Sequence, residues 1–300
     1  MMVEYWKREL TLHRKAVGVV TGAGCALGAA SARQLVDHVD TLLLTDRDPR
    51  AAAALARELV EDAGVDAQPF TLDLTDRQGP IRLAARIEEL GALRAVVHAD
   101  LCSPTLSDWR QILTVDLVAT ARLADVLRPL ADNGTAMAVL AAMSPMLDPR
   151  TPDTAALAIL DNPLDPHFLG RMREALGPGL ESPSAAYTWA KRGLHRFVRR
   201  ESVQLGAVGA RICSVSPGVI DTALSQLEAA EFPSIDRIVQ RTPLRRMGHA
   251  EEVAAVVAFV LSEQASFLNG IDLLVDGGAC AANDIDSVVA PRQAAPVLAS

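Results

Sequence analysis

Short apolar runs alternate with longer amphipathic stretches along most of the chain. The first apolar run, 16–21, is rich in valine, has the length of a strand, and is followed by glycines and a helical pattern. The same order recurs after apolar runs at 41–46, 66–73, 93–100, 135–143 and 210–216, and a last apolar run follows at 271–278. Parallel strands need crossover helices and are buried on both faces, so they are continuously apolar. The pattern therefore predicts an α/β fold, a doubly wound parallel sheet (Rossmann fold) in a single domain.

The alternation also sets the expected domain limits. We expect an N-terminal extension at 1–15, one domain at 16–278 and a C-terminal tail at 279–300. Within the domain, the Pro-punctuated stretch at about 145–183 contains two short helical patterns and reads as an insertion.

Charge and cysteine content narrow the class of partner. The formal net charge is −8, which argues against nucleic acid or an anionic membrane as a partner, because phosphate backbones attract clustered Lys and Arg. The four cysteines are widely spaced and the six histidines scattered, so neither a disulfide framework nor a metal site is indicated. The charged start of the chain is unlike a signal peptide, and no apolar run reaches membrane-spanning length. We expect a cytoplasmic protein with a small-molecule substrate.

A glycine-rich turn, TGAGCALG at 21–28, joins the first predicted strand to its helix. Such a turn lets the backbone approach a pyrophosphate, whose charge is stabilised by the free N–H groups at the helix start. Asp46 ends the second strand, where a carboxylate can accept both hydroxyls of an adenosine ribose and would repel a 2′-phosphate. This predicts NAD rather than NADP, although Arg47 leaves NADP open. A plain tight turn beside a solvated Asp is the alternative.

One of the two tyrosines, Tyr187, stands four residues before Lys191. On a helix these positions share a face, so the ammonium would lie beside the phenol. Such a pair could serve acid–base chemistry or could be an ordinary surface pair, and the two residues alone do not decide between these readings.

Together these motifs resemble the short-chain dehydrogenase/reductase family from about Ala16 to Gly278. The glycine motif TGxxxGxG is matched at Thr21, Gly22 and Gly28, and the pair Y-x-x-x-K at Tyr187 and Lys191. The segment PGVIDT matches the PG-x-x-x-T segment that follows the sixth strand, and LVDGG is a frequent ending in the family.

The resemblance implies roles for these positions. Tyr187 would exchange a proton with the substrate oxygen, and Lys191 would bind the nicotinamide ribose and lower the pKa of the tyrosine together with the oxidised cofactor. Asp73 stands where relatives hold the adenine amino group. The implied cofactor-binding residues are Thr21, Gly22, Ala26, Leu27, Gly28, Asp46, Arg47, Asp73, Leu74, His98, Ala99, Tyr187, Lys191, Pro217, Gly218, Val219 and Thr222.

Several positions depart from the family pattern. Ala26 replaces the middle glycine, and HADL at 98–101 stands where relatives have NNAG. Asp116 replaces the asparagine of a water-linked proton relay, and a carboxylate could also accept from that water. Ala142 falls at the position of the serine that orients the substrate oxygen. Ser144 follows two residues later, and a bend after the strand could bring its hydroxyl back, so we expect Ser144 to act as the fourth catalytic residue beside Tyr187, Lys191 and Asp116.

The insertion at about 145–183 resembles the enlarged loop of some bacterial hydroxysteroid dehydrogenase-like members of the family. It could be an apolar lid, a role that 223–240 could share, or an element of subunit packing, since it precedes the helix that pairs subunits in many relatives. The resemblance also implies a homo-oligomer, dimer or tetramer.

Two functions remain open on the sequence. The first is an NAD-dependent oxidoreductase that interconverts a secondary alcohol and a ketone, with an apolar or cyclic substrate. The second is a degenerate member that binds the cofactor but catalyses a non-redox reaction, such as a cyclase or isomerase, or acts as a binding scaffold. Intact Tyr187, Lys191 and Thr222 favour the first, whereas Ala142, Ala26 and HADL favour the second.

Overall fold

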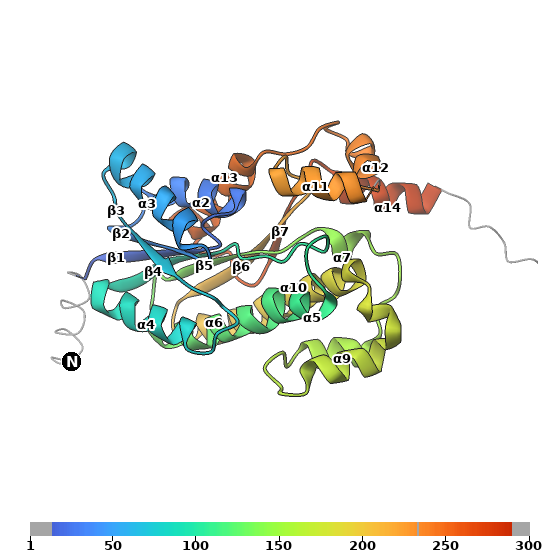
Figure 1. Cartoon of the computed structure of the whole chain (residues 1–300), viewed down its shortest axis with the longest axis horizontal. Helices are drawn as coiled ribbons and strands as arrows, with labels where there is room; N and C mark the ends of the chain where they lie inside the picture. The colour runs from blue at the N-terminus through green and yellow to red at the C-terminus, as the bar shows by residue number, and fades with distance from the viewer. Residues whose placement is uncertain (1–13, 233, 290–300) are drawn as a thin grey trace, which may run out of the picture.

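The computed structural model describes residues 14–232 and 234–289, which form one α/β domain with a sheet between two layers of helices (Figure 1). The strands are β1 (Ala16–Thr21), β2 (Thr41–Asp46), β3 (Asp66–Thr71), β4 (Ala92–His98), β5 (Ala136–Leu140), β6 (Arg211–Pro217) and β7 (Asp272–Val275). The helices before the fifth strand are α2 (Ala26–Leu35), α3 (Pro49–Ala63), α4 (Gly79–Leu90), α5 (Trp109–Leu113) and α6 (Thr120–Leu127). The later helices are α7 (Ser144–Leu147), α8 (Thr154–Leu160), α9 (Phe168–Leu176), α10 (Pro183–Gly206), α11 (Ala223–Glu231), α12 (Ser234–Arg241), α13 (Ala250–Leu261) and α14 (Ala279–Val289).

The sheet is parallel throughout, with the strand order β3-β2-β1-β4-β5-β6-β7. The chain winds outward from β1 to β3, then crosses back to β4 and winds in the other direction. The reversal between β1 and β4 leaves a crevice at the carboxyl ends of the strands, which is where this class of sheet binds ligands. The predicted doubly wound fold is therefore confirmed.

Both faces of the sheet are buried, as the continuous apolar runs require. Neighbouring residues of a strand point to opposite faces, so Val96 packs in one core cluster and Val97 in the other. The cluster with Val97 is closed by α2, α3 and α13, and the cluster with Val96 by α4, α6 and α10 (Figure 1).

The long helix predicted around 108–130 is present but interrupted. Between α5 and α6, residues Thr114–Ala119 form a π-helical turn, η1, which holds Asp116. An inserted residue of this kind re-aims the side chains of the turn and is frequent at functional sites. Periodicity alone did not predict it, because α5 and α6 flank it with ordinary helical spacing.

A helix follows the predicted domain at its C-terminal end. The segment after Gly278, expected as a tail, continues as α14 and contacts α12 and α7. Of the predicted N-terminal extension, residues 1–13 lie outside the described part of the chain.

Candidate active site at the carboxyl ends of the strands

The glycine-rich turn after β1 is a close approach of backbone to backbone. Gly22 has φ +64°, and a Cβ atom there would come within 2.7 Å of Ala99 O. A Cβ at Gly28 would lie 2.1 Å from Gly22 O, so only glycine fits where α2 packs on the turn. The turn thus forms a cradle at the N-terminus of α2, which fits a pyrophosphate.

Cys25 has a role in this turn that the sequence did not indicate. Its Sγ accepts a hydrogen bond from Gly28 N at 3.2 Å and caps α2. Burial raises the pKa of Cys25 to about 11, so the thiol adds no negative charge beside the cradle. Ala26, which replaces the middle glycine, is the first residue of α2 and is exposed.

Asp46 is held over the same turn by two backbone donors. Gly24 N donates to Oδ2 and Asp48 N donates to Oδ1, both at 2.8 Å. The carboxylate is thereby fixed at the end of β2, beside the cradle, with further lone pairs for ribose hydroxyls. Arg47 is exposed next to it. Asp73 Oδ1 accepts hydrogen bonds from Thr75 N and Thr75 Oγ1.

His98 links β1 to the helix that carries Asp116. Its Nδ1 lies 2.7 Å from Thr21 Oγ1, and its Nε2 lies 2.7 Å from Thr120 Oγ1. Thr120 donates its own proton to Asp116 O, so His98 donates from Nε2 and accepts from Thr21 at Nδ1. Burial, and then the charge of Lys191, lower the pKa of His98 to about 3, so the ring is neutral. Both ring nitrogens of His98 are thus engaged by protein hydroxyls, so the side chain has a structural role between β1 and α6.

Asp100, two residues further on, was not predicted as part of the site. Its backbone N borders the Gly22 turn, 2.8 Å from the position of a Gly22 Cβ. Burial and the nearby charges of Asp46 and Asp116 raise the pKa of Asp100 to about 6.

Tyr187 and Lys191 share one face of α10, as their spacing predicts. Lys191 Nζ lies 5.1 Å from the centroid of the Tyr187 ring. Burial raises the pKa of Tyr187, and the charges of Asp116 and Glu228 raise it further. The protein alone therefore raises the pKa of Tyr187, whereas the family resemblance implies a lowered pKa when the oxidised cofactor is bound.

Asp116 lies directly against Lys191. Its Oδ2 is 2.9 Å from Lys191 Nζ, and neither side chain is exposed. Its Oδ1 accepts from Cys102 N at 2.7 Å. Apart from this ion pair, neither Oδ2 nor Nζ has a hydrogen-bond partner among the described residues, so two of the three donors of the Lys191 ammonium remain for a ligand. Burial raises the pKa of Asp116, although the Lys191 charge acts in the opposite direction.

The position of Ser144 corrects one expectation. The apolar run at 135–143 was expected to be a strand throughout, but β5 ends at Leu140. Ser144 begins the short helix α7, so Ala142 and Ser144 do not lie on one extended strand. Both residues nevertheless line the same cavity as Tyr187. Ser144 Oγ is buried there without a hydrogen-bond partner among the described residues.

This cavity has a volume of about 330 Å³ and lies over the carboxyl ends of β5 and β6. Most of its lining is apolar, and it includes predicted residues from three elements: Leu27, Pro217, Gly218, Val219 and Thr222. Thr222 also caps α11, because its Oγ1 accepts from Ser225 N. The side chain of Leu74, in contrast, packs in the core.

The helices α11 and α12, together with Phe232 between them, line one side of the cavity and are here called the lid. Leu224, Glu228, Phe232, Ile235 and Ile238 of this region line the cavity. The helices α8 and α9 of the insertion at 145–183 contribute none of the described lining residues and pack against the rest of the chain. Phe168 and Met172 of α9 pack with Trp109 and Leu117 in a separate cluster against α5, η1 and α10.

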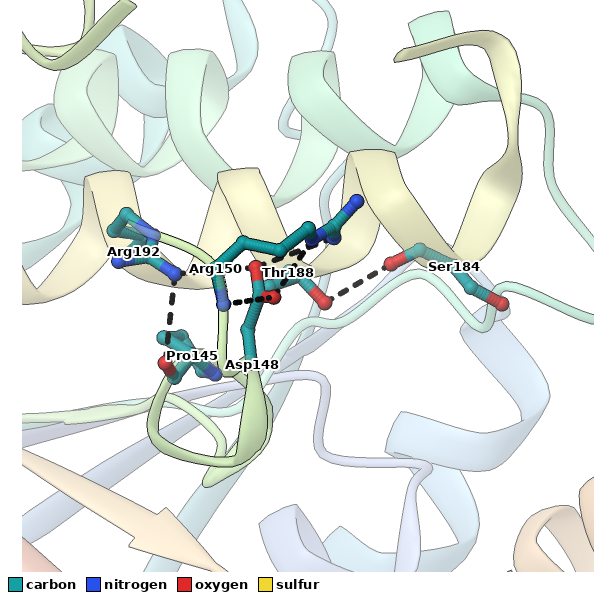
Figure 2. A network of polar contacts seen from close by, with 6 residues as sticks. All are labelled: Pro145, Asp148, Arg150, Ser184, Thr188 and Arg192. Atoms are coloured by element: carbon teal, nitrogen blue, oxygen red, sulfur yellow. Dashed lines mark hydrogen bonds and ion pairs between the residues drawn. The ribbon is translucent and has the colours of Figure 1, made fainter. Parts of the chain in front are cut away.

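The start of the insertion is fastened to the helix of the Tyr–Lys pair (Figure 2). Arg192 Nη2 donates to Pro145 O and Asp148 Oδ2, each at 3.4 Å, and Arg150 also binds Asp148. These contacts hold α7, and with it Ser144, beside α10. The sequence reasoning missed Arg192, whose partners are more than 40 residues away in sequence.

Two absences complete the description of the site. None of the described helices is long and apolar enough to cross a membrane. In the same part of the chain, no group of three or more His, Cys, Asp or Glu side chains is placed to hold a metal ion.

Two family models match the chain. A family model described as short chain dehydrogenase matches residues 16–140, and one described as Enoyl-(Acyl carrier protein) reductase matches residues 178–280. The two matches leave out 141–177, which contains most of the insertion.

Curated relatives extend over nearly the whole chain. Cis-4-hydroxycyclohexanecarboxylate dehydrogenase of Sinomonas cyclohexanicum is 30% identical over 274 residues, which cover 87% of this chain and 95% of the relative. Cyclohexanol dehydrogenase of Acinetobacter sp. (strain SE19) is 28% identical and covers 87% and 93%. A solved short-chain type dehydrogenase/reductase from Mycobacterium ulcerans shares the fold, with a TM-score of 0.71, 21% identity and coverage of 92% and 94%. The chain therefore belongs to the short-chain dehydrogenase/reductase family of oxidoreductases.

Proposed function

We propose that the protein is an NAD-dependent oxidoreductase that interconverts a secondary alcohol and a ketone. The observation that carries the proposal is the position of Tyr187, whose phenol lines an apolar cavity at the carboxyl ends of the strands with Lys191 one helical turn away. Both the glycine cradle and the unpartnered donors of Lys191 fit a nicotinamide dinucleotide.

A bound nicotinamide supplies or accepts the hydride, and the side chains of this chain position the substrate and move the proton. Tyr187 donates its phenolic proton to the substrate oxygen during ketone reduction and recovers it during alcohol oxidation. Ser144 Oγ, unpartnered and buried in the cavity wall, donates to the same oxygen. Because burial and two carboxylates raise the pKa of Tyr187, the protonated form needed for ketone reduction is favoured at neutral pH.

The choice of cofactor rests on Asp46. Its carboxylate is fixed beside the cradle, where a 2′-phosphate would meet a like charge, and this supports NAD over NADP. Arg47, exposed beside it, is the residue that would accommodate NADP.

The substrate class rests on the lining of the cavity and on the relatives. Leu27, Met143, Leu147, Val219 and Phe232 give the cavity an apolar surface. Two relatives are named as dehydrogenases of cyclohexanol and of a hydroxycyclohexane carboxylate. These features support an apolar or cyclic secondary alcohol.

A second candidate is a non-redox member of the family. Asp116 neutralises Lys191 and raises the pKa of Tyr187, which opposes formation of the phenolate, and Ala142 offers no hydroxyl. A cofactor-binding protein without hydride transfer would be consistent with these features.

The experiment that separates the two candidates follows NADH oxidation with cyclic ketones and NAD reduction with the corresponding alcohols. We expect turnover, and Tyr187→Phe should bind NADH almost unchanged while turnover falls by about 10²–10⁴-fold, since only the proton donor is lost. Arg199→Gln, at an exposed position on the same helix, is the control. NADH binding without turnover on any ketone or alcohol would favour the non-redox candidate.

We further propose that the protein acts as a homo-oligomer in the cytoplasm. The four cysteines are free, which suits a reducing compartment. Phe267 is fully exposed close to β7, the last strand of the sheet, where Ile271 and Leu274 are also exposed. Light scattering should give the mass of a dimer or tetramer, and Phe267→Asp should lower that mass if this edge pairs two copies.

A further inference from the structure

We propose that Glu228 selects the substrate, because it binds a second hydroxyl group on a neutral alcohol and excludes alcohols that carry a carboxylate. This inference rests on the proposed function and names the class of alcohol that the cavity accepts.

Glu228 is exceptional in the lining of the cavity. Among the described lining residues, Glu228 is the one with an Asp, Glu, Lys, Arg or His side chain. The other side chains of the lining are apolar or carry a hydroxyl, apart from the thiol of Cys102. Placing a carboxylate in an apolar surface costs free energy unless a hydrogen-bond donor pairs with it. Glu228 is half-buried, so a donor on the molecule that fills the cavity would replace the water that otherwise reaches this carboxylate.

One oxygen of Glu228 is already fixed by the protein. Ser103 Oγ, from the loop after β4, donates to Glu228 Oε1 at 2.6 Å. This bond joins the lid to the opposite wall and orients the carboxylate in the cavity. Within the described residues, Oε2 receives no hydrogen bond, and no Lys, Arg or His side chain pairs with Glu228. An oriented acceptor is thus left for a ligand.

The carboxylate is also within electrostatic reach of the reacting group. The charge of Glu228 is one of the causes that raise the pKa of Tyr187, and both side chains line the same cavity. A substrate whose reacting oxygen lies at Tyr187 would therefore bring its far end toward Glu228.

These contacts predict an order of preference. A second hydroxyl on the substrate donates to Oε2, and a hydrogen bond to a charged group in an apolar site favours binding by about 10–100-fold. A plain alcohol gains nothing there. A substrate carboxylate would meet a like charge in a site with no cationic side chain among the described lining residues, and would bind more weakly still.

The test compares three ligands that share a six-membered ring and a secondary hydroxyl: cyclohexane-1,4-diol, cyclohexanol and 4-hydroxycyclohexanecarboxylate. Their affinities are measured by calorimetry with NADH-saturated protein, in which alcohols bind without hydride transfer, and kcat/KM is measured separately with NAD. The variants are Glu228→Gln and, as control, Glu231→Gln, which removes the same charge from an exposed position on the same helix.

For the unmodified protein and Glu231→Gln we expect the affinity order diol, cyclohexanol, carboxylate. In Glu228→Gln the carboxylate should gain about tenfold relative to cyclohexanol, and the diol should lose part of its advantage. An equal change for all three ligands would show that Glu228 only fastens the lid, and a carboxylate that binds the unmodified protein as well as the diol would also overturn the proposal. The expected order in binding without any turnover would support this selectivity while contradicting the proposed redox function.

Discussion

Lys191 Nζ lies 2.9 Å from Asp116 Oδ2, and both side chains are withdrawn from solvent. A carboxylate of the same chain thus neutralises Lys191. The family resemblance implies that the charge of this lysine stabilises the deprotonated tyrosine. An asparagine at this position would leave the lysine charge uncompensated and would raise the pKa of Tyr187 less, because Asp116 is a cause of that rise.

Asp116→Asn should therefore shift the pH profile of alcohol oxidation to lower pH. The negative charge that disfavours the phenolate is removed, so the pKa of Tyr187 falls and the deprotonated base is available at lower pH. The free energy of unfolding should fall by up to about 3 kcal/mol, because Lys191 stays buried without its counterion. The measurements are kcat against pH and urea unfolding.

Asp125→Asn is the control for this prediction. Asp125 pairs with Arg128 on the surface of α6, with 56% of its side chain exposed, so its loss should change neither quantity appreciably. A pH profile that is the same in Asp116→Asn and in the unmodified protein would mean that Asp116 does not control the charge of Tyr187.

Asp46→Ala should reduce the preference for NADH over NADPH by about tenfold, since a like-charge contact with the 2′-phosphate worth about 1.4 kcal/mol is removed. The readout is the ratio of the two dissociation constants. Both affinities should also fall somewhat, because Gly24 N loses its acceptor in the turn. Asp62→Asn is the matched control, since it lies at the other end of α3. Equal affinities of the unmodified protein for the two cofactors would refute the role of Asp46.

The residues that the sequence predicted well share one property: their geometry follows from local spacing or from a strand end. Tyr187 and Lys191 meet because they are one helical turn apart, and Asp46 reaches the glycine turn because parallel strands end at the same edge. The parallel sheet with helices on both faces likewise follows from the alternation of apolar and amphipathic segments.

What the sequence did not predict depends on contacts between distant segments. The bond between Ser103 and Glu228 joins positions 125 residues apart, and the π-helical turn that carries Asp116 has no signature in hydrophobic spacing. The sequence left the role of the insertion at 145–183 undecided for the same reason. Its apolar residues fit either a lid or a subunit contact, and the partners of Phe168 and Met172 within the chain come from distant segments.

His98 should make stability depend on pH. Its pKa is about 3 in the folded protein, against about 6.5 when unfolded, so between these values the unfolded chain binds a proton that the folded chain does not. The free energy of unfolding therefore falls as pH decreases below about 6.5, by about 1.4 kcal/mol per pH unit from this residue. In His98→Asn, which cannot titrate, the fall between about pH 7.5 and about pH 5 should be smaller by about 2 kcal/mol.

Urea unfolding of both proteins at the two pH values measures this difference. His38→Asn, at an exposed position after α2, should keep the slope of the unmodified protein. The same slope in His98→Asn would show that His98 is protonated in the folded state or that its environment opens at low pH.

Ser144→Ala should lower kcat for ketone reduction by about 10²–10³-fold with little change in stability, because a positioned donor to the developing oxyanion is worth about 2.7–4 kcal/mol. The structural reason is that Ser144 Oγ is buried in the cavity wall and has no hydrogen-bond partner among the described residues, so a substrate oxygen is the partner it lacks. Ala142→Ser places a hydroxyl at the position that the family uses and should add little while Ser144 is present. The informative comparison is the double variant, Ala142→Ser with Ser144→Ala: partial recovery of kcat would show that the two positions reach the same oxygen. Full activity of Ser144→Ala, together with a large gain in Ala142→Ser, would instead mean that the site lacks its donor and that Ser144 only begins α7.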